Sequence, residues 1–382
     1  MKKLIMFIVL LSSLFILVSC IEEDLGEIPV FSGVEDKEYL LGDTFDPLLG
    51  ITAVDQDGND LTELIEVDGL DDMGLFNNTL ANVGKFTLTF TVTDENGLTA
   101  MAEALITVIN PEDIDLGLYG CDAITQGDYV LTWCDEFTDV GFNFNAHGVN
   151  LDKWRFQIGT GTQYGLTNWG NNEQQYYREQ NARVEDGRLI IEAKRESYAG
   201  KNYTSARLWT QPTFSQTYGR FEASIKLPAG DGMWPAFWML PQNSPYGGWA
   251  RGGELDIMEA RGRLPRQATG AIHFGDTWPN NTYSSNTYFF PTGTDITDFN
   301  EYAVEWEEGV IRWYVNGINF YTLTNWYATG FDFPAPFDVN FYLILNLAIG
   351  GNFDGNILPP DSLFDEPVLM EVDYVRVYQK QN

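Results

Sequence analysis

The stretch Gly253-Glu-Leu-Asp-Ile-Met-Glu-Ala-Arg-Gly262 places three carboxylates within six residues of an apolar-laced segment. Side chains of a β-strand alternate between its two faces, so Glu254 and Asp256 share one face of the predicted strand. In a regular strand Glu259, five residues after Glu254, would point to the other face. An extra residue at the apolar pair Ile257 and Met258, a β-bulge, would return Glu259 to the face of the other two acids.

Three carboxylates on one sheet face repel one another, and this clustering raises the pKa of at least one of them. Glycoside hydrolysis needs such a set, with an ionised carboxylate as nucleophile and a protonated carboxyl as general acid. Two alternatives stay open from the pattern alone. The acids could lie on a solvated outer face with an accidental spacing, or they could hold a divalent cation.

Strand signals extend on both sides of the acid stretch, over residues 128–382. Apolar and polar residues alternate over 220–227, and Asn316-Gly317 is typical of a hairpin turn. Residues 372–378 close the chain as a further strand. About 250 residues with strands at this spacing and no long helical pattern predict one large all-β sandwich or jelly roll.

Residues 28–110 predict a smaller β-sandwich. Lys85–Thr93 alternates strictly between apolar residues and threonine or lysine, a turn signal follows, and Leu98–Val108 is the expected return strand. The segment resembles the immunoglobulin-like modules of bacterial surface proteins, through Val54-Asp55 and Thr91-Val-Thr-Asp94. We expect a spacer, with glycan binding as the alternative, followed by a polar linker over 111–127.

The first residues predict export. Two lysines precede an apolar run over 4–18, too short for a membrane-spanning helix, and Leu17-Val-Ser-Cys20 resembles a bacterial lipoprotein signal. This predicts a signal peptide over 1–20, lipidation of Cys20 and an acidic linker over 21–27. The chain would then be an outer-membrane lipoprotein that faces the periplasm or the outside. An ordinary cleaved signal and an uncleaved anchor are the alternatives.

The amino-acid composition limits the classes of partner that the protein can bind. The 382 residues include 55 Asp and Glu against 22 Lys and Arg, a net charge of −33, which excludes nucleic acid because phosphate binding needs a basic surface. With Cys20 lipidated, Cys121 and Cys134 remain, either as a disulfide or as two separate thiols. We expect a monomer.

The acid stretch resembles the active-site strand of glycoside hydrolase family 16, in the bulged form of its laminarinase-like members. Further stretches carry the same resemblance over roughly residues 130–380: Trp169–Tyr177, Tyr203–Arg207, Tyr218–Glu222, Trp234–Pro241, Phe341–Gly351 and Val372–Tyr378. The resemblance implies a concanavalin-like jelly roll with an open cleft. It also implies endo-hydrolysis of β-1,3-glucan (laminarin) with retention of configuration and no catalytic cofactor.

Other functions stay open beside this one. Mixed-linkage β-1,3-1,4-glucan and algal galactan are the alternative substrates. A non-catalytic glycan-binding surface lipoprotein is the alternative of another class. The loop Gly247–Gly253 lacks the proline and serine often seen before the acids in relatives, which leaves the finer substrate preference open.

By position, the resemblance makes Glu254 the nucleophile, Glu259 the acid/base and Asp256 the residue that tunes the nucleophile. Trp234 and Trp238 are expected as platforms for sugar rings. The full set of predicted substrate-binding residues is Trp234, Trp238, Trp249, Asn172, Arg207, His273 and Asn346. Trp169 and Trp278 are weaker candidates. The resemblance also implies a structural Ca²⁺ held by Glu136, the carbonyl of Gly187 and Asp373.

Overall fold

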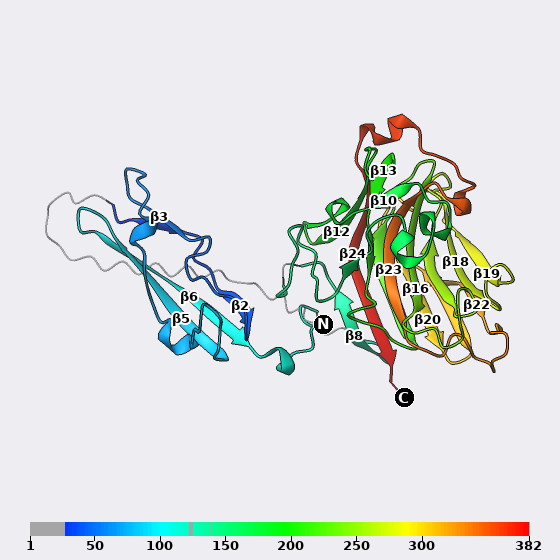
Figure 1. Cartoon of the computed structure of the whole chain (residues 1–382), viewed down its shortest axis with the longest axis horizontal. Coiled ribbons are helices and arrows are strands. Elements are labelled where there is room, and N and C mark those ends of the chain that lie inside the picture. Colours follow the sequence, from blue (N-terminus) through cyan, green and yellow to red (C-terminus); the bar gives the residue numbers. More distant parts are fainter. Residues whose placement is uncertain (1–26, 122–124, 139, 382) are drawn as a thin grey trace. The chain divides into compact units, whose positions relative to one another are not determined.

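The computed structural model describes residues 27–121, 125–138 and 140–381, and the chain divides into two compact units, Met1–Asn110 and Pro111–Asn382 (Figure 1). The predicted signal peptide, Cys20 and residues 21–26 of the acidic linker lie outside the described residues. Among the described residues, no helix has the length and apolar character needed to cross a membrane. Both units are built from strands, which confirms the predicted all-β class.

In the first unit a four-stranded sheet has the order β2 (Lys37–Leu40), β6 (Thr99–Ile109), β5 (Gly84–Thr93), β4 (Glu66–Asp68). A strand pair, β1 (Val30–Ser32) and β3 (Thr52–Val54), and two 3-10 turns, η1 (Thr62–Leu64) and η2 (Asp71–Met73), complete it. The long β5–β6 hairpin confirms the predicted pair of strands. Leu88, Phe90 and Val92 are buried on one face of β5, as the alternation predicts. The immunoglobulin-like identity of the unit stays a prediction.

The second unit is a sandwich of two large sheets. The nine-stranded sheet runs β11 (Ala182–Glu185), β12 (Arg188–Ala193), β24 (Val368–Lys380), β15 (Gly219–Lys226), β20 (Asn300–Glu307), β21 (Val310–Val315), β22 (Ile318–Leu323), with β8 (Tyr129–Asp135) and β7 (Thr125–Gln126) attached through β24. The seven-stranded sheet runs β19 (Thr282–Phe289), β18 (Gln267–Phe274), β17 (Glu254–Glu259), β16 (Met233–Pro241), β23 (Phe341–Ile349), β14 (Arg207–Trp209), β9 (Arg155–Phe156).

Short elements fill the connections. Strands β10 (Gln175–Tyr177) and β13 (Tyr203–Ser205) pair in parallel. The helical turns are η3 (Pro111–Asp113), η4 (Thr162–Tyr164), η5 (Asn168–Gly170), η6 (Glu179–Asn181), η7 (Asn352–Asp354) and η8 (Asp361–Asp365). This jelly-roll architecture and the hairpin at Asn316-Gly317 agree with the predictions from sequence.

The core lies between the two large sheets, and strand β15 is buried on both of its faces. Phe221 and Ile225 point into the core, as the alternation predicts. On the other face Glu222 is also fully buried, because the hydroxyl of Tyr378 and the amide of Gln126 cover it and donate hydrogen bonds to its carboxylate. A polar position in an alternating strand is therefore not always a solvated one.

Strand β17 contains the predicted bulge. Against β16, Phe237 pairs with Met258 and Trp238 pairs with Asp256, so Ile257 is the extra residue. Against β18 the register likewise shifts between Asp256 and Glu259. Both apolar residues of the bulge therefore join the core, which leaves the three acids on the opposite face of the sheet.

Gly270 of β18 and Trp313 of β21 support this bulge from the neighbouring strand and from the opposite sheet. A Cβ atom on Gly270 would lie 2.3 Å from the Trp313 ring, so only glycine leaves room for the indole. The indole N–H of Trp313 donates a hydrogen bond to the carbonyl oxygen of Asp256 at 2.8 Å. The core thus holds the backbone of the acid strand directly.

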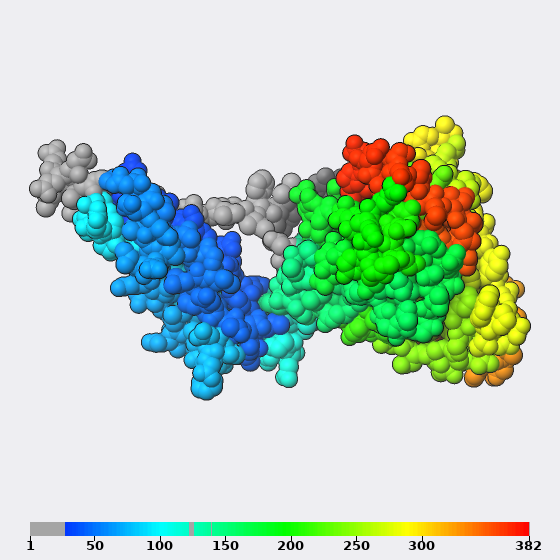
Figure 2. All heavy atoms as spheres, turned by 45° about the horizontal axis from the view of Figure 1, so that its top comes forward, coloured from blue at the N-terminus to red at the C-terminus, as the bar shows by residue number. Residues whose placement is uncertain are grey.

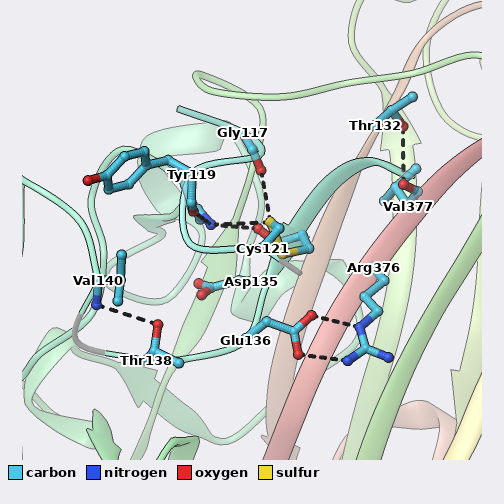
Figure 3. Close-up of a disulfide and its surroundings, with 12 residues drawn as sticks. Gly117, Tyr119, Cys121, Thr132, Asp135, Glu136, Thr138, Val140, Arg376 and Val377 are labelled. Carbon is cyan, nitrogen blue, oxygen red and sulfur yellow. Dashed lines mark hydrogen bonds and ion pairs between the residues drawn. A yellow bond between two sulfur atoms is a disulfide. The ribbon is translucent and has the colours of Figure 1, made fainter. Parts of the chain in front are cut away.

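A disulfide between Cys121 and Cys134 joins the linker to β8, with the two Cα atoms 6.0 Å apart (Figure 3). This settles the alternative left open from the sequence. Next to it, the buried ammonium group of Lys153 donates hydrogen bonds to the carbonyls of Tyr119 and Cys134, both at 2.8 Å. The end of the linker is therefore fastened to the second unit.

Candidate active site

The three acids of β17 gather on the face of the seven-stranded sheet that points away from the core. Asp256 is only 3% exposed, whereas Glu254 and Glu259 are partly exposed. His273 lies on β18 and pairs with Glu254 of β17. Its Nε2 atom lies 3.7 Å from Oε1 of Glu254 and 3.5 Å from Oδ2 of Asp256. The structure thus places the predicted substrate-binding residue His273 beside Glu254 and Asp256.

Two tryptophans donate hydrogen bonds to the outer two acids. The indole N–H of Trp249 reaches Oε2 of Glu254 at 2.9 Å, and that of Trp234 reaches Oε1 of Glu259 at 2.9 Å. Oδ2 of Asp256 is buried and has no hydrogen-bond partner among the described residues. The outer carboxyls are therefore each held by one N–H donor, and the middle one is not.

Burial raises the pKa of all three carboxyls. Desolvation raises the pKa values of Glu254 and Glu259 to about 7, while the hydrogen bonds from Trp249 and Trp234 act against this rise. The pKa of Asp256 lies well above its usual range because of desolvation and then the charges of Glu259 and Glu254. Burial also lowers the pKa of His273, so its imidazole is neutral at neutral pH. The site therefore retains protons where isolated carboxyls would be ionised.

A second group of predicted residues lies on the neighbouring strands β14, β16 and β23. The guanidinium carbon of Arg207 lies 4.7 Å from the ring centroid of Trp238 and 4.5 Å from that of Trp169. The indole N–H of Trp238 donates to Oδ1 of Asn346 at 2.7 Å, and the Asn346 amide donates to the Tyr177 hydroxyl at 3.2 Å. Arg207, Trp238 and Asn346 thus form one hydrogen-bonded and stacked group beside the acids.

Of the two predicted sugar platforms, Trp238 is partly exposed and Trp234 is enclosed. Trp234 is 8% exposed and its ring stacks on Phe353, with 5.1 Å between ring centroids. Trp249 is 42% exposed and Trp278 is 70% exposed, with 6.4 Å between their ring centroids. Trp169 is buried and donates its N–H to the carbonyl of Gly159, which is a packing role. Trp249 and Trp278 are therefore the most exposed of these tryptophans.

Asn172 lies in the exposed loop before β10. Its amide donates a hydrogen bond to the side chain of Asn356 at 2.9 Å, which links this loop to the segment after β23. Its φ of +59° places it in the left-handed region, where asparagine is one of the tolerated residues. The structure therefore gives Asn172 a loop-to-loop contact.

Sequence reasoning missed Glu173 and Tyr177, which lie inside the quoted stretch Trp169–Tyr177. Glu173 is 3% exposed and accepts hydrogen bonds from the Tyr177 hydroxyl at 3.0 Å and the Gln175 amide at 2.6 Å. Burial raises the pKa of Glu173, and the nearby Arg207 acts against that rise. In the sequence, the sign of a special role is that the charged Glu173 stands two residues before strand β10. No rule of residue spacing connects Glu173 to strand β17.

Glu254, Asp256 and His273 form a group of side chains that could bind a metal ion. Ligand atoms of Glu254, Asp256 and His273 lie within 4.8 Å of one another, so the cation alternative for the acid stretch has a compact donor set. A cation there would take up the oxygen of Glu254 that faces His273. This would compete with any use of Glu254 as a nucleophile.

Of the predicted calcium ligands, Asp373 lies on strand β24, and Glu136 and Gly187 lie at the ends of strands paired with it. One edge of β24 pairs first with β12 and then with β8, so Gly187, which precedes β12, and Glu136, which follows β8, approach Asp373. Both oxygens of Glu136 accept hydrogen bonds from Arg376, at 2.7 and 2.8 Å (Figure 3). Asp373 lies 3.9 Å from Nε of Arg188. A cation would have to compete with two arginines for these carboxylates, so the donor set fits Ca²⁺ only if those pairs open.

A jelly roll whose sheet carries such a row of carboxyls with raised pKa values, bordered by indoles and hydrogen-bonding groups, has the architecture expected of a glycoside hydrolase. Residues 169–350 match the sequence model of glycosyl hydrolases family 16. The chain belongs to this family, as the resemblance of its acid stretch implies.

Individual proteins similar to this chain support its membership of the family. Glucan endo-1,3-beta-glucosidase A1 of Niallia circulans is 45% identical over 296 residues, which are 72% of this chain and 41% of that protein. The glucan endo-1,3-beta-glucosidase of Cryptopygus antarcticus is 39% identical over 270 residues, 66% of this chain and 93% of that protein. The crystal structure of the laminarinase from Rhodothermus marinus has a TM-score of 0.57 and 41% identity, covering 66% of this chain and 98% of that chain. The chain thus spans less than half the length of the Niallia circulans protein.

Proposed function

We propose that this protein hydrolyses β-1,3-glucan within the chain, with retention of configuration. The observation that carries the proposal is the row of three acids on the bulged strand β17, with an indole N–H donated to each outer carboxyl. The two β-1,3-glucanase relatives and the laminarinase structure support the choice of glucan.

In the first step, a carboxylate oxygen of Glu254 attacks the anomeric carbon and the glycosidic C–O bond breaks. Glu259 gives its proton to the leaving oxygen, so a glycosyl ester of Glu254 and a shortened glucan chain form. In the second step water attacks the same carbon, Glu259 takes its proton, and the ester bond breaks. Glu254 returns as a carboxylate and Glu259 as an acid, and two inversions give net retention.

Asp256 and the tryptophans set the protonation states that this sequence needs. A proton kept on Asp256 removes a negative charge from beside Glu254, which lets Glu254 ionise. The N–H of Trp249 then stabilises the charged form of Glu254. Desolvation, with the charge of Glu254, raises the pKa of Glu259 to about 7, so Glu259 holds a proton up to near neutral pH and can act as the acid.

A product profile tests this proposal. The full chain after residue 20 is incubated with laminarin, mixed-linkage β-1,3-1,4-glucan and agarose, and the anomeric form of the first products is followed by NMR. We expect internal cleavage of laminarin with β-configured products, and a Glu254→Gln variant that folds normally but loses at least about three orders of magnitude of rate. Faster cleavage of one of the other two polymers would move the assignment to that substrate. Binding of laminarin with no hydrolysis would favour the glycan-binding alternative.

We further propose that the protein is an exported lipoprotein, anchored through Cys20, whose first unit is a spacer. The support is the sequence of residues 1–20 and the acidic stretch after it. Mass spectrometry of the mature N-terminus in a Gram-negative host tests this. A diacylglyceryl group on Cys20, and release of a Cys20→Ser variant from the membrane fraction, are the expected results. An unmodified mature N-terminus elsewhere would contradict them.

Calcium binding at Glu136, Gly187 and Asp373 also stays a proposal. If it holds, Ca²⁺ raises the melting temperature relative to EDTA, and an Asp373→Asn variant abolishes the difference. An identical melting curve with Ca²⁺ and EDTA would show that Arg376 and Arg188 already satisfy the two carboxylates.

A further inference from the structure

Strand β17 continues directly into Ala260, Arg261, Gly262 and Arg263, and these two arginines hold the segment that follows β23. Nε of Arg261 donates a hydrogen bond to the carbonyl oxygen of Phe353 at 2.8 Å, and its guanidinium carbon lies 3.8 Å from the centroid of the Phe353 ring. Nε of Arg263 lies 2.7 Å from Oδ1 of Asp354, which is fully buried. The strand that carries Glu259 is therefore tied to this segment within a few residues of the acid.

The held segment contacts the tryptophan that binds Glu259. The Phe353 ring stacks on Trp234 with 5.1 Å between centroids and 28° between planes. A Cβ on Gly351 would lie 2.8 Å from the Trp234 ring, so the backbone of the segment also closes on the indole. Trp234 in turn donates its N–H to Oε1 of Glu259. A continuous path of contacts leads from Arg261 through Phe353 and Trp234 back to Glu259.

Other bonds fix this segment to the rest of the unit. The amide of Asn352 donates to the carbonyl of Asn171 at 2.8 Å, and Asn356 accepts from Asn172. Figure 2 shows the part of the chain that precedes β24, at the red end of the scale, lying beside the green atoms of residues around 170–205. The segment that presses on Trp234 is therefore fastened on both sides.

We propose that Arg261 and Phe353 are positioning residues for the general acid, which act by holding the Trp234 indole in place against Glu259. This inference rests on the proposed function and deepens it. Neither residue touches the reacting atoms. The charge of Arg261 also lowers the pKa of Glu259, and an Arg261→Lys variant keeps that charge. The effect proposed here is on the orientation of the Glu259 carboxyl, and misplacing a catalytic group by about 1 Å can cost about 100-fold in rate.

Substrates with different leaving groups distinguish the positioning of Glu259 from a general contribution of these residues to the fold. A glucan alkoxide needs a proton from Glu259 as it departs, whereas 2,4-dinitrophenolate departs without one. In Arg261→Met and Phe353→Leu we expect kcat/KM on laminarin to fall about tenfold or more, and kcat/KM on 2,4-dinitrophenyl β-laminaribioside to fall less than about threefold. An Arg261→Lys variant, which keeps a cation but not the planar stack, should lie between Arg261→Met and the wild type.

Arg178→Met is the matched control, since the Arg178 guanidinium carbon lies 3.9 Å from the Tyr198 ring centroid, away from β17, and should show no dependence on leaving group. Equal losses on both substrates in Arg261→Met and Phe353→Leu, or no loss on laminarin, would overturn the proposal. A wild-type protein that cleaves neither substrate would overturn the proposed function instead. Melting curves identify any variant that fails to fold, and Arg261→Lys then provides the comparison.

Discussion

The indole N–H of Trp249 donates a hydrogen bond to Oε2 of Glu254 over 2.9 Å, although 42% of the Trp249 side chain is exposed. The carboxyl itself is largely desolvated, which raises its pKa to about 7, and this single donor favours its charged form. A residue at the surface thus controls how readily the proposed nucleophile ionises.

Replacing Trp249 by phenylalanine removes the donor and keeps a ring. A hydrogen bond to a charged group contributes about 1.5–3 kcal/mol, so kcat/KM on laminarin below neutral pH should fall about tenfold or more. The pKa of Glu254 rises further, because the ionised form loses its donor, and the acidic limb of the pH profile moves to higher pH. The measurement is kcat/KM from pH 4 to 8. In a Trp278→Phe control the acidic limb should coincide with that of the wild type, and an unmoved limb in Trp249→Phe would refute the role.

Gly270 offers a test of the bulge. An alanine at this position would place its Cβ 2.3 Å from the Trp313 ring, and the ring would have to leave the carbonyl of Asp256. We expect Gly270→Ala to lower the free energy of unfolding by about 1–3 kcal/mol. We also expect the folded variant to lose hydrolytic activity on laminarin, because the three acids no longer share one face of the strand. Urea unfolding and laminarin assays measure the two effects. Gly248→Ala, where the nearest atom would be 3.8 Å away, is the stability control. Wild-type activity in Gly270→Ala would show that the bulge does not depend on this contact.

Much of the acid strand could be predicted from its own residues. The adjacent pair Ile257 and Met258 breaks the alternation, and a bulge is the simplest way to bury both, which the register confirms. The support of that bulge could not be predicted in this way. Trp313 reaches Asp256 from the opposite sheet, 57 residues away along the chain, and nothing local to either residue signals the contact.

The same limit applies to Phe353 and Glu173. Phe353 lies in η7, two residues after a glycine pair, and in the sequence it resembles any surface aromatic residue; only the fold shows that it stacks on Trp234. Glu173 resembles a solvated acid, yet Tyr177 and Gln175 enclose it. Local periodicity predicts which face of a strand a residue occupies. It does not predict what a distant segment places on that face.

The disulfide between Cys121 and Cys134 should contribute to stability without entering the chemistry. A loop of 13 residues restricts the unfolded chain, for which the chain-entropy model gives about 3 kcal/mol. We expect Cys121→Ser combined with Cys134→Ser to lower the melting temperature by on the order of 10 °C and to leave kcat at 25 °C unchanged. Dithiothreitol should lower the melting temperature of the wild type similarly and have no effect on the double variant. Equal melting temperatures with and without the disulfide would contradict this.

The raised pKa values of Glu254 and Glu259 predict that these two carboxyls destabilise the fold at alkaline pH. In the unfolded chain a glutamate has a pKa of about 4.3, whereas in the folded chain both values are about 7. Between these values the folded state binds more protons than the unfolded state, so the free energy of unfolding falls as pH rises through this window. Below it both states are protonated, and above it the full cost of two buried charges remains.

Glutamine at position 254 or 259 keeps the shape of the glutamate side chain and removes its titratable carboxyl. Glu254→Gln and Glu259→Gln should therefore melt close to the wild type at pH 4 and above it by about 3 °C or more at pH 8. All 11 tryptophans lie between residues 133 and 326, in the second unit, so tryptophan fluorescence follows the unfolding of that unit alone. The exposed Glu308, changed to glutamine, is the control for replacing a surface glutamate. If the variants of these two acids instead gave the same difference at pH 4 and pH 8, neither pKa would be raised in the folded protein, and Glu259 would lack the proton that the proposed general acid needs.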